Sequence, residues 1–262
     1  MLQFGLDNRL GSDINFETKG NIPTPEFYDR MHNNRWGFSR IISLSIGQGE
    51  ILITPLQMAN VISTIANRGY YYTPHCIRRV DDKSAIPEKF KEKHKVKISR
   101  ENFEAVVEGM AQTMISGTAA RTGIEGIEIC GKTGTVQNPH GKNHSVFMCF
   151  APKDNPKIAI ACIVENAGFG ATWAAPVATL MIEKYIKRDT ISSKPEMEKR
   201  LFDAYLLPKP RPIDTVKLKH LKDSTRKVKS DSIERRKKNS NKQTNNHPLN
   251  HDMVLNLSLI HI

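Results

Sequence analysis

The sequence predicts an α+β protein in which an antiparallel sheet is covered by helices. Two nearly all-apolar segments, 146–151 and 158–164, flank the turn Pro-Lys-Asp-Asn-Pro, a pattern typical of a hairpin whose strands are buried on both faces. Other segments carry apolar residues at helical spacing. Because such strands need a layer above and a layer below, we expect these helices to cover the sheet.

The first helix is predicted over 54–67. Thr54 stands at the N-cap position and Pro55 at the first helical position, and the segment ends at Asn67-Arg68-Gly69. Apolar residues recur between these signals with the spacing of one helix face (Leu56, Met58, Ala59, Ile62 and Ile65). The segment is therefore read as an amphipathic helix.

The remaining elements follow from shorter patterns. Segment 41–46 is apolar and is predicted to be a short strand, and 70–80 is predicted to be extended. A second helix is expected to begin at Ser99 and to end near 114–117. A third is expected over 174–186, after the hairpin.

The two ends of the chain differ in character from its middle. Phe4-Gly5 resembles the end of a helix that nothing precedes, so we expect the chain to begin inside a domain. Of the net charge of +12, the segment 190–262 contributes 16 Lys and Arg against 8 Asp and Glu. We predict a disordered basic low-complexity tail over 189–262, whose last six residues, LSLIHI, match a translated sequencing-adapter end and are expected to be foreign.

Composition excludes several classes of protein. No apolar run reaches the roughly 18–20 residues that a membrane span needs, and no signal peptide opens the chain. The four cysteines lack metal-binding spacing, and we expect three of them, Cys130, Cys149 and Cys162, to be buried hydrophobic residues. His140 and His144 lie in a Pro- and Gly-containing segment, which favours a loop over a zinc site. No metal or cofactor is predicted.

The segment 129–138, ICGKTGTVQN, is the strongest candidate for a functional site. A lysine and a glycine both weaken a strand, so Lys132 and Gly134 call for a functional reason. On a strand these two residues point to one face, and Thr133 and Thr135 point to the other. Such a strand at a cleft can bind an extended peptide as an added strand.

Each of these residues suits a part of acyl transfer on a small peptide acid. Gly134 lets a peptide backbone come close, and Lys132 supplies positive potential. The hydroxyls of Thr133 and Thr135 can bind a carboxylate, and the backbone N–H of Thr135 can donate to a developing oxyanion.

Five blocks of sequence extend this pattern. In this order and at these distances they resemble the transpeptidase domain of class B penicillin-binding proteins, especially the elongation type, penicillin-binding protein 2. The resemblance covers about 1–188 and implies the C-terminal half of a serine β-lactamase/transpeptidase-like fold. The blocks are NIPTPEFYD (21–29), SIGQGEILITPLQMAN (45–60), GKTGTVQN (131–138), NHSVFMCFAP (143–152) and WAAPVATLMIEKYI (173–186).

The resemblance implies a peptidoglycan D,D-transpeptidase that cross-links stem peptides through a serine acyl-enzyme and is trapped by β-lactams. Lys132 would be the lysine of the third catalytic motif, while Thr133, Gly134 and Thr135 would bind the substrate. Implied partners are stem peptides ending in D-Ala-D-Ala, β-lactams and the membrane glycosyltransferase of the elongation machinery. The implied location is the periplasmic face of the inner membrane.

The sequence departs from the family at the nucleophile. The family's SxxK and SxN motifs lie upstream of the first block, where this chain has neither. Its only SxxK is Ser224–Lys227, in the basic tail, and SxN does not occur. We therefore predict that this chain alone neither transpeptidates nor forms a penicillin adduct, and that it aggregates because apolar surface is left exposed.

Two other functions remain as alternatives. A serine β-lactamase or D,D-carboxypeptidase would use the same motif and release the acyl group to water. A non-catalytic remnant could instead bind nucleic acid through its basic tail. Because Phe202 and Tyr205 are the tail's only aromatic residues, stacking on bases is disfavoured and no nucleic-acid partner is expected.

Overall fold

The computed structural model describes residues 1–77, 86–188 and 191–207. The chain divides into two units, 1–206 and 207–262, and every described helix and strand lies in the first. The predicted basic tail beyond Leu207, the sequence Ser224–Lys227 and the adapter-like end lie outside the described residues.

A three-stranded antiparallel sheet forms the centre of the first unit, as predicted. Its strands are β3 (Cys130–Val136), β4 (His144–Ala151) and β5 (Ile158–Val164), in the order β3-β4-β5. The turn between β4 and β5 is the predicted proline-containing turn, and the pairing of β3 with β4 places Lys132 opposite Met148. The α+β class is therefore confirmed.

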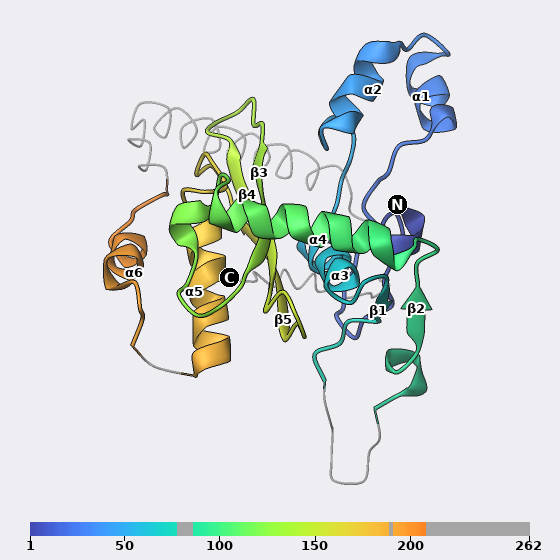
Figure 1. Ribbon diagram of the computed structural model, residues 1–262. Helices are drawn as coiled ribbons and strands as arrows, with labels where there is room; N and C mark the ends of the chain where they lie inside the picture. The colour runs from blue at the N-terminus through green and yellow to red at the C-terminus, as the bar shows by residue number, and fades with distance from the viewer. Residues whose placement is uncertain (78–85, 189–190, 208–262) are drawn as a thin grey trace, which may run out of the picture. The chain divides into compact units, whose positions relative to one another are not determined.

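Helices cover both faces of this sheet (Figure 1). Helices α3 (Pro55–Ala66) and α4 (Arg100–Ile115) lie on one face, and α5 (Ala174–Lys187) lies on the other. Successive residues of β4 point to opposite faces, so each face has its own apolar core. Phe147 and Cys149 pack with Ala174, Ala178 and Ile182 of α5, whereas Phe150 packs with Ile62, Val107 and Met110 of α3 and α4.

The beginning of α3 confirms the predicted cap and adds to it. The hydroxyl of Thr54 accepts from the backbone N–H of Gln57 at 3.1 Å, and the backbone N–H of Thr54 donates to the Gln57 side chain at 3.0 Å. This reciprocal capping box satisfies two otherwise free donors. The Gln57 amide also donates to the carbonyls of Gly5, Asn8 and Lys19, so the same residue holds the N-terminal loop against α3.

The smaller elements complete the first unit. Strands β1 (Tyr70–Tyr72) and β2 (Lys93–Lys95) pair antiparallel. The segment predicted to be extended over 70–80 therefore begins as a strand, residues 73–77 are not part of one, and 78–80 lie outside the described ranges. Three single-turn helices, η1 (Leu2–Phe4), η2 (Glu88–Phe90) and η3 (Ala120–Thr122), lie in the connections.

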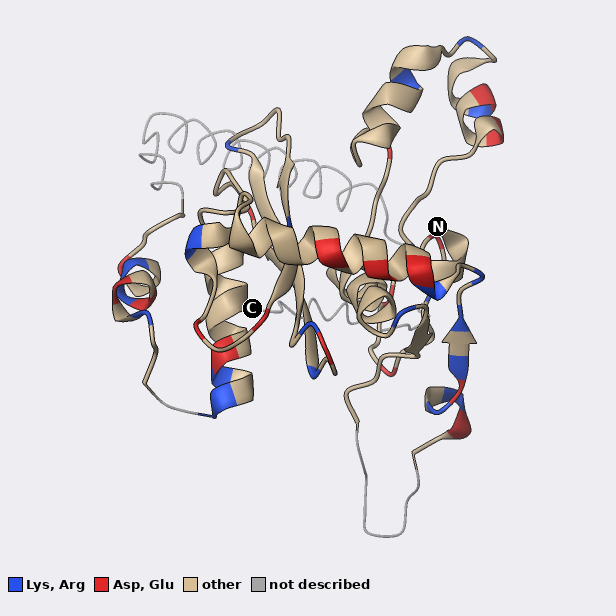
Figure 2. Ribbon diagram, in the orientation of Figure 1, with Lys and Arg blue, Asp and Glu red and all other residues tan. Residues whose placement is uncertain are grey.

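The exposed side of α4 is acidic (Figure 2). There Glu104 pairs with Arg68 at 3.3 Å and Glu108 with Lys153 at 2.7 Å. These pairs join α4 to the end of α3 and to the β4–β5 turn. Because exposed ion pairs contribute at most about 1 kcal/mol each, the apolar cores dominate the attachment of α4.

The segment 41–46 is not the predicted strand. It lies in α2 (Phe38–Ser45), which follows α1 (Pro25–His32). Phe38, Ile41 and Ile42 are spaced like one helix face, and a short apolar run of this kind fits a helix and a strand equally well. Helix α2 leaves these side chains largely exposed, with Phe38 at 73%.

A partly buried carboxylate holds α1 and α2 together. Glu50 accepts from the phenol of Tyr28 and from the guanidinium of Arg40, both at 2.7 Å. The Tyr28 hydrogen bond lowers the pKa of Glu50, and burial raises the pKa of Tyr28 to about 12. The pair therefore stays as a neutral phenol and a carboxylate throughout the physiological pH range.

The apolar face of α2 leads to a test of the predicted aggregation. Replacing Phe38 with lysine is expected to lower the aggregated fraction of the full chain, because it removes the most exposed apolar side chain of this helix. Light scattering during purification measures the fraction. The matched control, Ser39→Lys, adds the same charge to the same helix without removing apolar surface, and an equal effect of both would refute the explanation.

The predicted tail begins with a helix, which corrects the expectation of disorder from residue 189 onward. Helix α6 (Pro195–Phe202) starts with a proline at its first turn, and Met197 packs against the core beneath α5. The carboxylate of Glu183 accepts from Ser192 and from the backbone of Ser193, which fixes the connection. The charged composition of this segment does not reveal that Met197 packs against the core.

Candidate active site

The four predicted site residues lie on β3, at one edge of the three-stranded sheet. Within the described ranges β3 pairs only with β4, so its other edge offers unpaired backbone groups. The register puts Lys132 opposite Met148 and Thr135 opposite Ser145. An edge strand of this kind is the element to which an extended peptide can be added.

Lys132 is exposed and lies beside an apolar hollow. The hollow has a volume of about 410 Å³ and is lined by side chains of α3, α4 and β4, among them Ile65, Met110 and Met148. The ammonium group donates to the carbonyl of Thr133 at 2.8 Å. A positive charge beside apolar surface is less screened than one in bulk water, so Lys132 is suited to attract an anionic ligand.

Thr133 points to the opposite face, as the strand pattern predicts. Its hydroxyl lies 2.7 Å from the hydroxyl of Thr118, which follows α4. Sequence reasoning missed Thr118, because the two threonines belong to different elements and no spacing rule joins them. This hydrogen bond orients the Thr133 hydroxyl.

The loop between β5 and α5 supports β3 from behind. A Cβ on Gly170 would lie 2.6 Å from the carbonyl oxygen of Gly134 and would overlap the carbonyl oxygen of Val146. Only a glycine allows the loop to come this close to the motif. The loop is anchored by Ser145, which donates to the carbonyl of Phe169 at 2.8 Å and accepts from the backbone of Ala174 at 3.1 Å.

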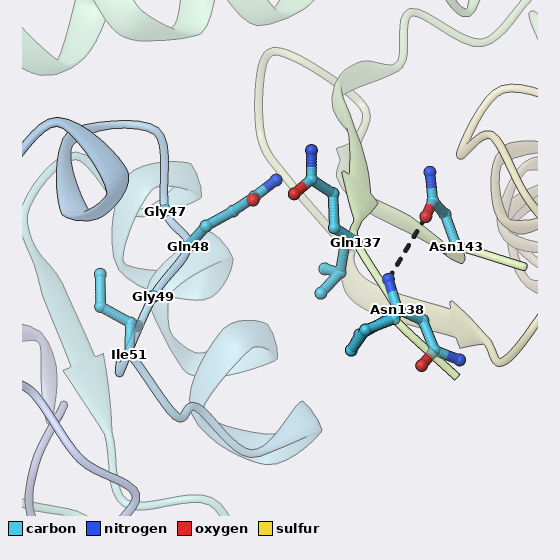
Figure 3. A pocket seen from close by; sticks show the side chains of 9 residues that line it. Gly47, Gln48, Gly49, Ile51, Gln137, Asn138 and Asn143 are labelled. Carbon is cyan, nitrogen blue, oxygen red and sulfur yellow. Dashed lines mark hydrogen bonds between the residues drawn. The ribbon is translucent and has the colours of Figure 1, made fainter. Parts of the chain in front are cut away.

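A second hollow lies where β3 ends (Figure 3). It has a volume of about 570 Å³ and lies between the loop that follows α2 and the loop that joins β3 to β4. Its polar side chains are all amides, from Gln48, Gln137, Asn138 and Asn143. Gln137 and Asn138 belong to the motif segment 129–138, whereas no pattern in the sequence predicts that Gln48 lies beside it.

The cysteines predicted to be buried are buried or partly buried, and one of the two histidines lies in the predicted loop. Cys130 and Cys149 are buried and Cys162 is partly buried, and burial raises the pKa of the Cys130 thiol to about 12. His140 lies in the β3–β4 loop as predicted, but His144 is the first residue of β4 and accepts from the backbone of Asn166 at 3.1 Å. Within the described ranges no group of three or more His, Cys, Asp or Glu is placed to hold a metal ion.

The chain is similar to curated peptidoglycan D,D-transpeptidases. The chain is 33% identical over 191 residues to peptidoglycan D,D-transpeptidase MrdA of Acinetobacter baumannii, covering 66% of this chain and 28% of the relative. It is 30% identical over 212 residues to MrdA of Haemophilus influenzae, covering 72% and 32%. The chain thus spans about a third of the length of the curated relatives it matches.

Solved structures of penicillin-binding proteins share the fold. Pseudomonas aeruginosa PBP2, solved in complex with WCK 5153, aligns with a TM-score of 0.63 at 27% identity, covering 74% of this chain and 44% of that one. Helicobacter pylori PBP2 aligns with a TM-score of 0.62 at 26% identity, covering 72% and 35%. Residues 1–183 match the penicillin binding protein transpeptidase domain. With its motif strand at the sheet edge and this match over most of its length, the chain belongs to the penicillin-binding protein transpeptidase family.

Proposed function

We propose that this chain is the C-terminal part of a peptidoglycan D,D-transpeptidase that cross-links stem peptides through a serine acyl-enzyme. The observation that carries the proposal is the position of Lys132–Thr135 on an edge strand, with the charge of Lys132 beside a hollow and the backbone of Gly134 backed by Gly170. The relatives named D,D-transpeptidase support the same reaction.

In this proposal β3 binds the donor stem peptide and stabilises charge. The peptide pairs with the free edge of β3, and its terminal carboxylate is bound by the hydroxyls of Thr133 and Thr135 in the positive potential of Lys132. The backbone N–H of Thr135 donates to the oxyanion that forms when a serine attacks the penultimate D-alanine carbonyl. D-Alanine then leaves, and an amine of a second stem peptide attacks the acyl-enzyme.

The nucleophile is not among these residues. Lys132–Thr135 bind and polarise the substrate, and the chain's only SxxK lies outside the described residues, in the basic tail. We therefore keep the prediction that the full chain alone forms no penicillin adduct. A protein with the upstream part of a relative is needed to observe the reaction.

The proposal is tested in such a joined protein. In the joined protein, the full chain follows the upstream part of Acinetobacter baumannii MrdA and replaces the matching segment of MrdA and all that follows it. The joined protein and the full chain alone are each incubated with a fluorescent penicillin. We expect a covalent fluorescent band on the joined protein and none on the full chain alone. A band on the full chain alone would refute the prediction that this chain lacks the nucleophile. A folded joined protein without a band would refute the proposal that this chain completes a transpeptidase site.

Location and partners follow the same proposal. Within the described ranges, no helix has both the length and the apolar character needed to cross a bilayer. We propose that the whole protein works at the periplasmic face of the inner membrane beside a membrane glycosyltransferase. Co-purification of the joined protein with the elongation glycosyltransferase from membranes tests this partner.

A further inference from the structure

The hollow at the end of β3 has no assigned role in the reaction and is uncharged. Gln48 enters it from the loop after α2, and Gln137 enters it directly after β3, so that the two side chains face each other across the gap (Figure 3). Apart from the four amide side chains, its lining is apolar or glycine. We call this hollow the amide pocket.

No charged side chain lines the pocket. Glu50 lies between two lining residues, but its carboxylate is bound to Tyr28 and Arg40 at 2.7 Å each. Gly47 and Gly49 flank Gln48 with φ values of 77° and 74°, a backbone conformation that favours glycine. The loop is thus shaped to present Gln48 while the adjacent carboxylate stays bound elsewhere.

The opposite wall is held in place by its own hydrogen bonds. The side chain of Asn143 accepts from the backbone N–H of Asn138 at 3.3 Å, and the side chain of Asn138 donates to Asn166 at 2.6 Å. Two of the four amides are therefore used to build the loop. Among the described residues, the side chains of Gln48 and Gln137 have no hydrogen-bond partner, which leaves donors and acceptors of both available to a ligand.

The path of a bound peptide leads into this pocket. If its terminal carboxylate lies at Thr133 and Thr135, the rest of an extended peptide can continue along β3 in only one direction. Toward Cys130 the strand is buried, with an exposure of 0%, whereas Gln137 at the other end is exposed. An extended peptide and β3 both advance about 3.4 Å per residue, so each peptide residue lies beside one residue of the strand. If the terminal D-alanine lies beside Thr135, the residue before the D-Ala-D-Ala dipeptide lies beside Gln137.

We propose that the amide pocket is a specificity subsite that binds an uncharged amide on the residue preceding the terminal dipeptide. The inference rests on the proposed function, since it takes the carboxylate position from it. An amide offers both donors and acceptors, which complement Gln48 and Gln137. A carboxylate or an ammonium in the same place would lose part of its hydration to a pocket without a countercharge.

The test uses three peptides that end in D-Ala-D-Ala and differ only in the preceding side chain: glutamine, glutamate or lysine. Each is used to slow fluorescent-penicillin labelling of the joined protein, and the concentration that halves the rate is measured. The glutamine peptide is expected to protect at about a tenfold lower concentration than either charged one, the ratio that corresponds to about 1.4 kcal/mol.

Two variants and a control separate this subsite from a general effect. Gln137→Glu is expected to shift the preference to the lysine peptide, and Gln48→Ala is expected to weaken the preference for glutamine. For each variant the peptides are ranked relative to that variant's own labelling rate without peptide, so that a change in this rate does not alter the ranking. Gln112→Glu, on the exposed side of α4, adds the same charge away from the pocket and should leave the ranking unchanged.

The possible results distinguish a failure of the subsite from a failure of the proposed function. Normal labelling with the same peptide ranking in Gln137→Glu and Gln48→Ala would overturn the subsite while leaving the proposed function intact. A folded, unmutated joined protein that is not labelled at all would overturn both. A changed ranking in the two pocket variants, but not in Gln112→Glu, would establish the subsite.

Discussion

Replacing Lys132 with alanine is expected to slow penicillin acylation of the joined protein by about 100- to 1,000-fold, the usual cost of removing one preorganised electrostatic group from an active site. The ammonium lies on the edge strand beside a hollow lined by Ile65 and Met110, where its field is less screened than in water. The acylation rate is measured by quenching the reaction with the fluorescent penicillin at a series of times and measuring the labelled fraction.

The matched control for this variant is Lys142→Ala. Lys142 is an exposed lysine in the loop between β3 and β4, and its removal changes the net charge by the same amount. We expect its labelling rate to stay within about twofold of the unmutated rate. If Lys132→Ala labels as fast as Lys142→Ala while both proteins melt normally, Lys132 has no part in the reaction.

Replacing Gly170 with alanine is expected to destabilise the joined protein by about 1–3 kcal/mol and to lower penicillin labelling. The added methyl group would overlap the carbonyl oxygen of Val146 and lie 2.6 Å from that of Gly134, and both of these atoms belong to backbone. Either the β5–α5 loop or the motif strand must move. Thermal unfolding is expected to shift down by several degrees.

A second glycine provides the control for this variant. Gly109 lies inside α4, and a Cβ added there would meet nothing within 4 Å. Gly109→Ala should leave the melting temperature unchanged or raise it, because alanine favours a helix over glycine by about 1 kcal/mol. An unchanged melt and unchanged labelling of Gly170→Ala would show that the loop can withdraw without disturbing β3.

The features that could be predicted are those written in neighbouring residues. Thr54 and Pro55 predict the start of α3 because a cap and a first-turn proline act within one turn. The alternation of Lys132 and Thr133 predicts their opposite faces because the side-chain period of a strand is two. The buried hairpin followed in the same way from two apolar runs and one turn.

The errors lie where a local pattern fits two structures. The run 41–46 suits a strand or a helix, and only the surroundings of α2 distinguish them. Helix α6 was missed because its charged composition resembles that of a solvated tail, although Met197 and the anchoring of Ser192 and Ser193 by Glu183 attach it to the first unit.

The sequence by itself determined the family, the layered α+β class and the four residues of the motif strand, since each can be recognised from patterns within short segments and from the order of those segments. Only the tertiary structure brought Thr118 to Thr133, Gly170 to Gly134 and Gln48 to Gln137. These pairs come from separate elements, and their proximity depends on how the elements pack. Packing is set by the sum of many weak apolar contacts across the whole core, which no short segment encodes.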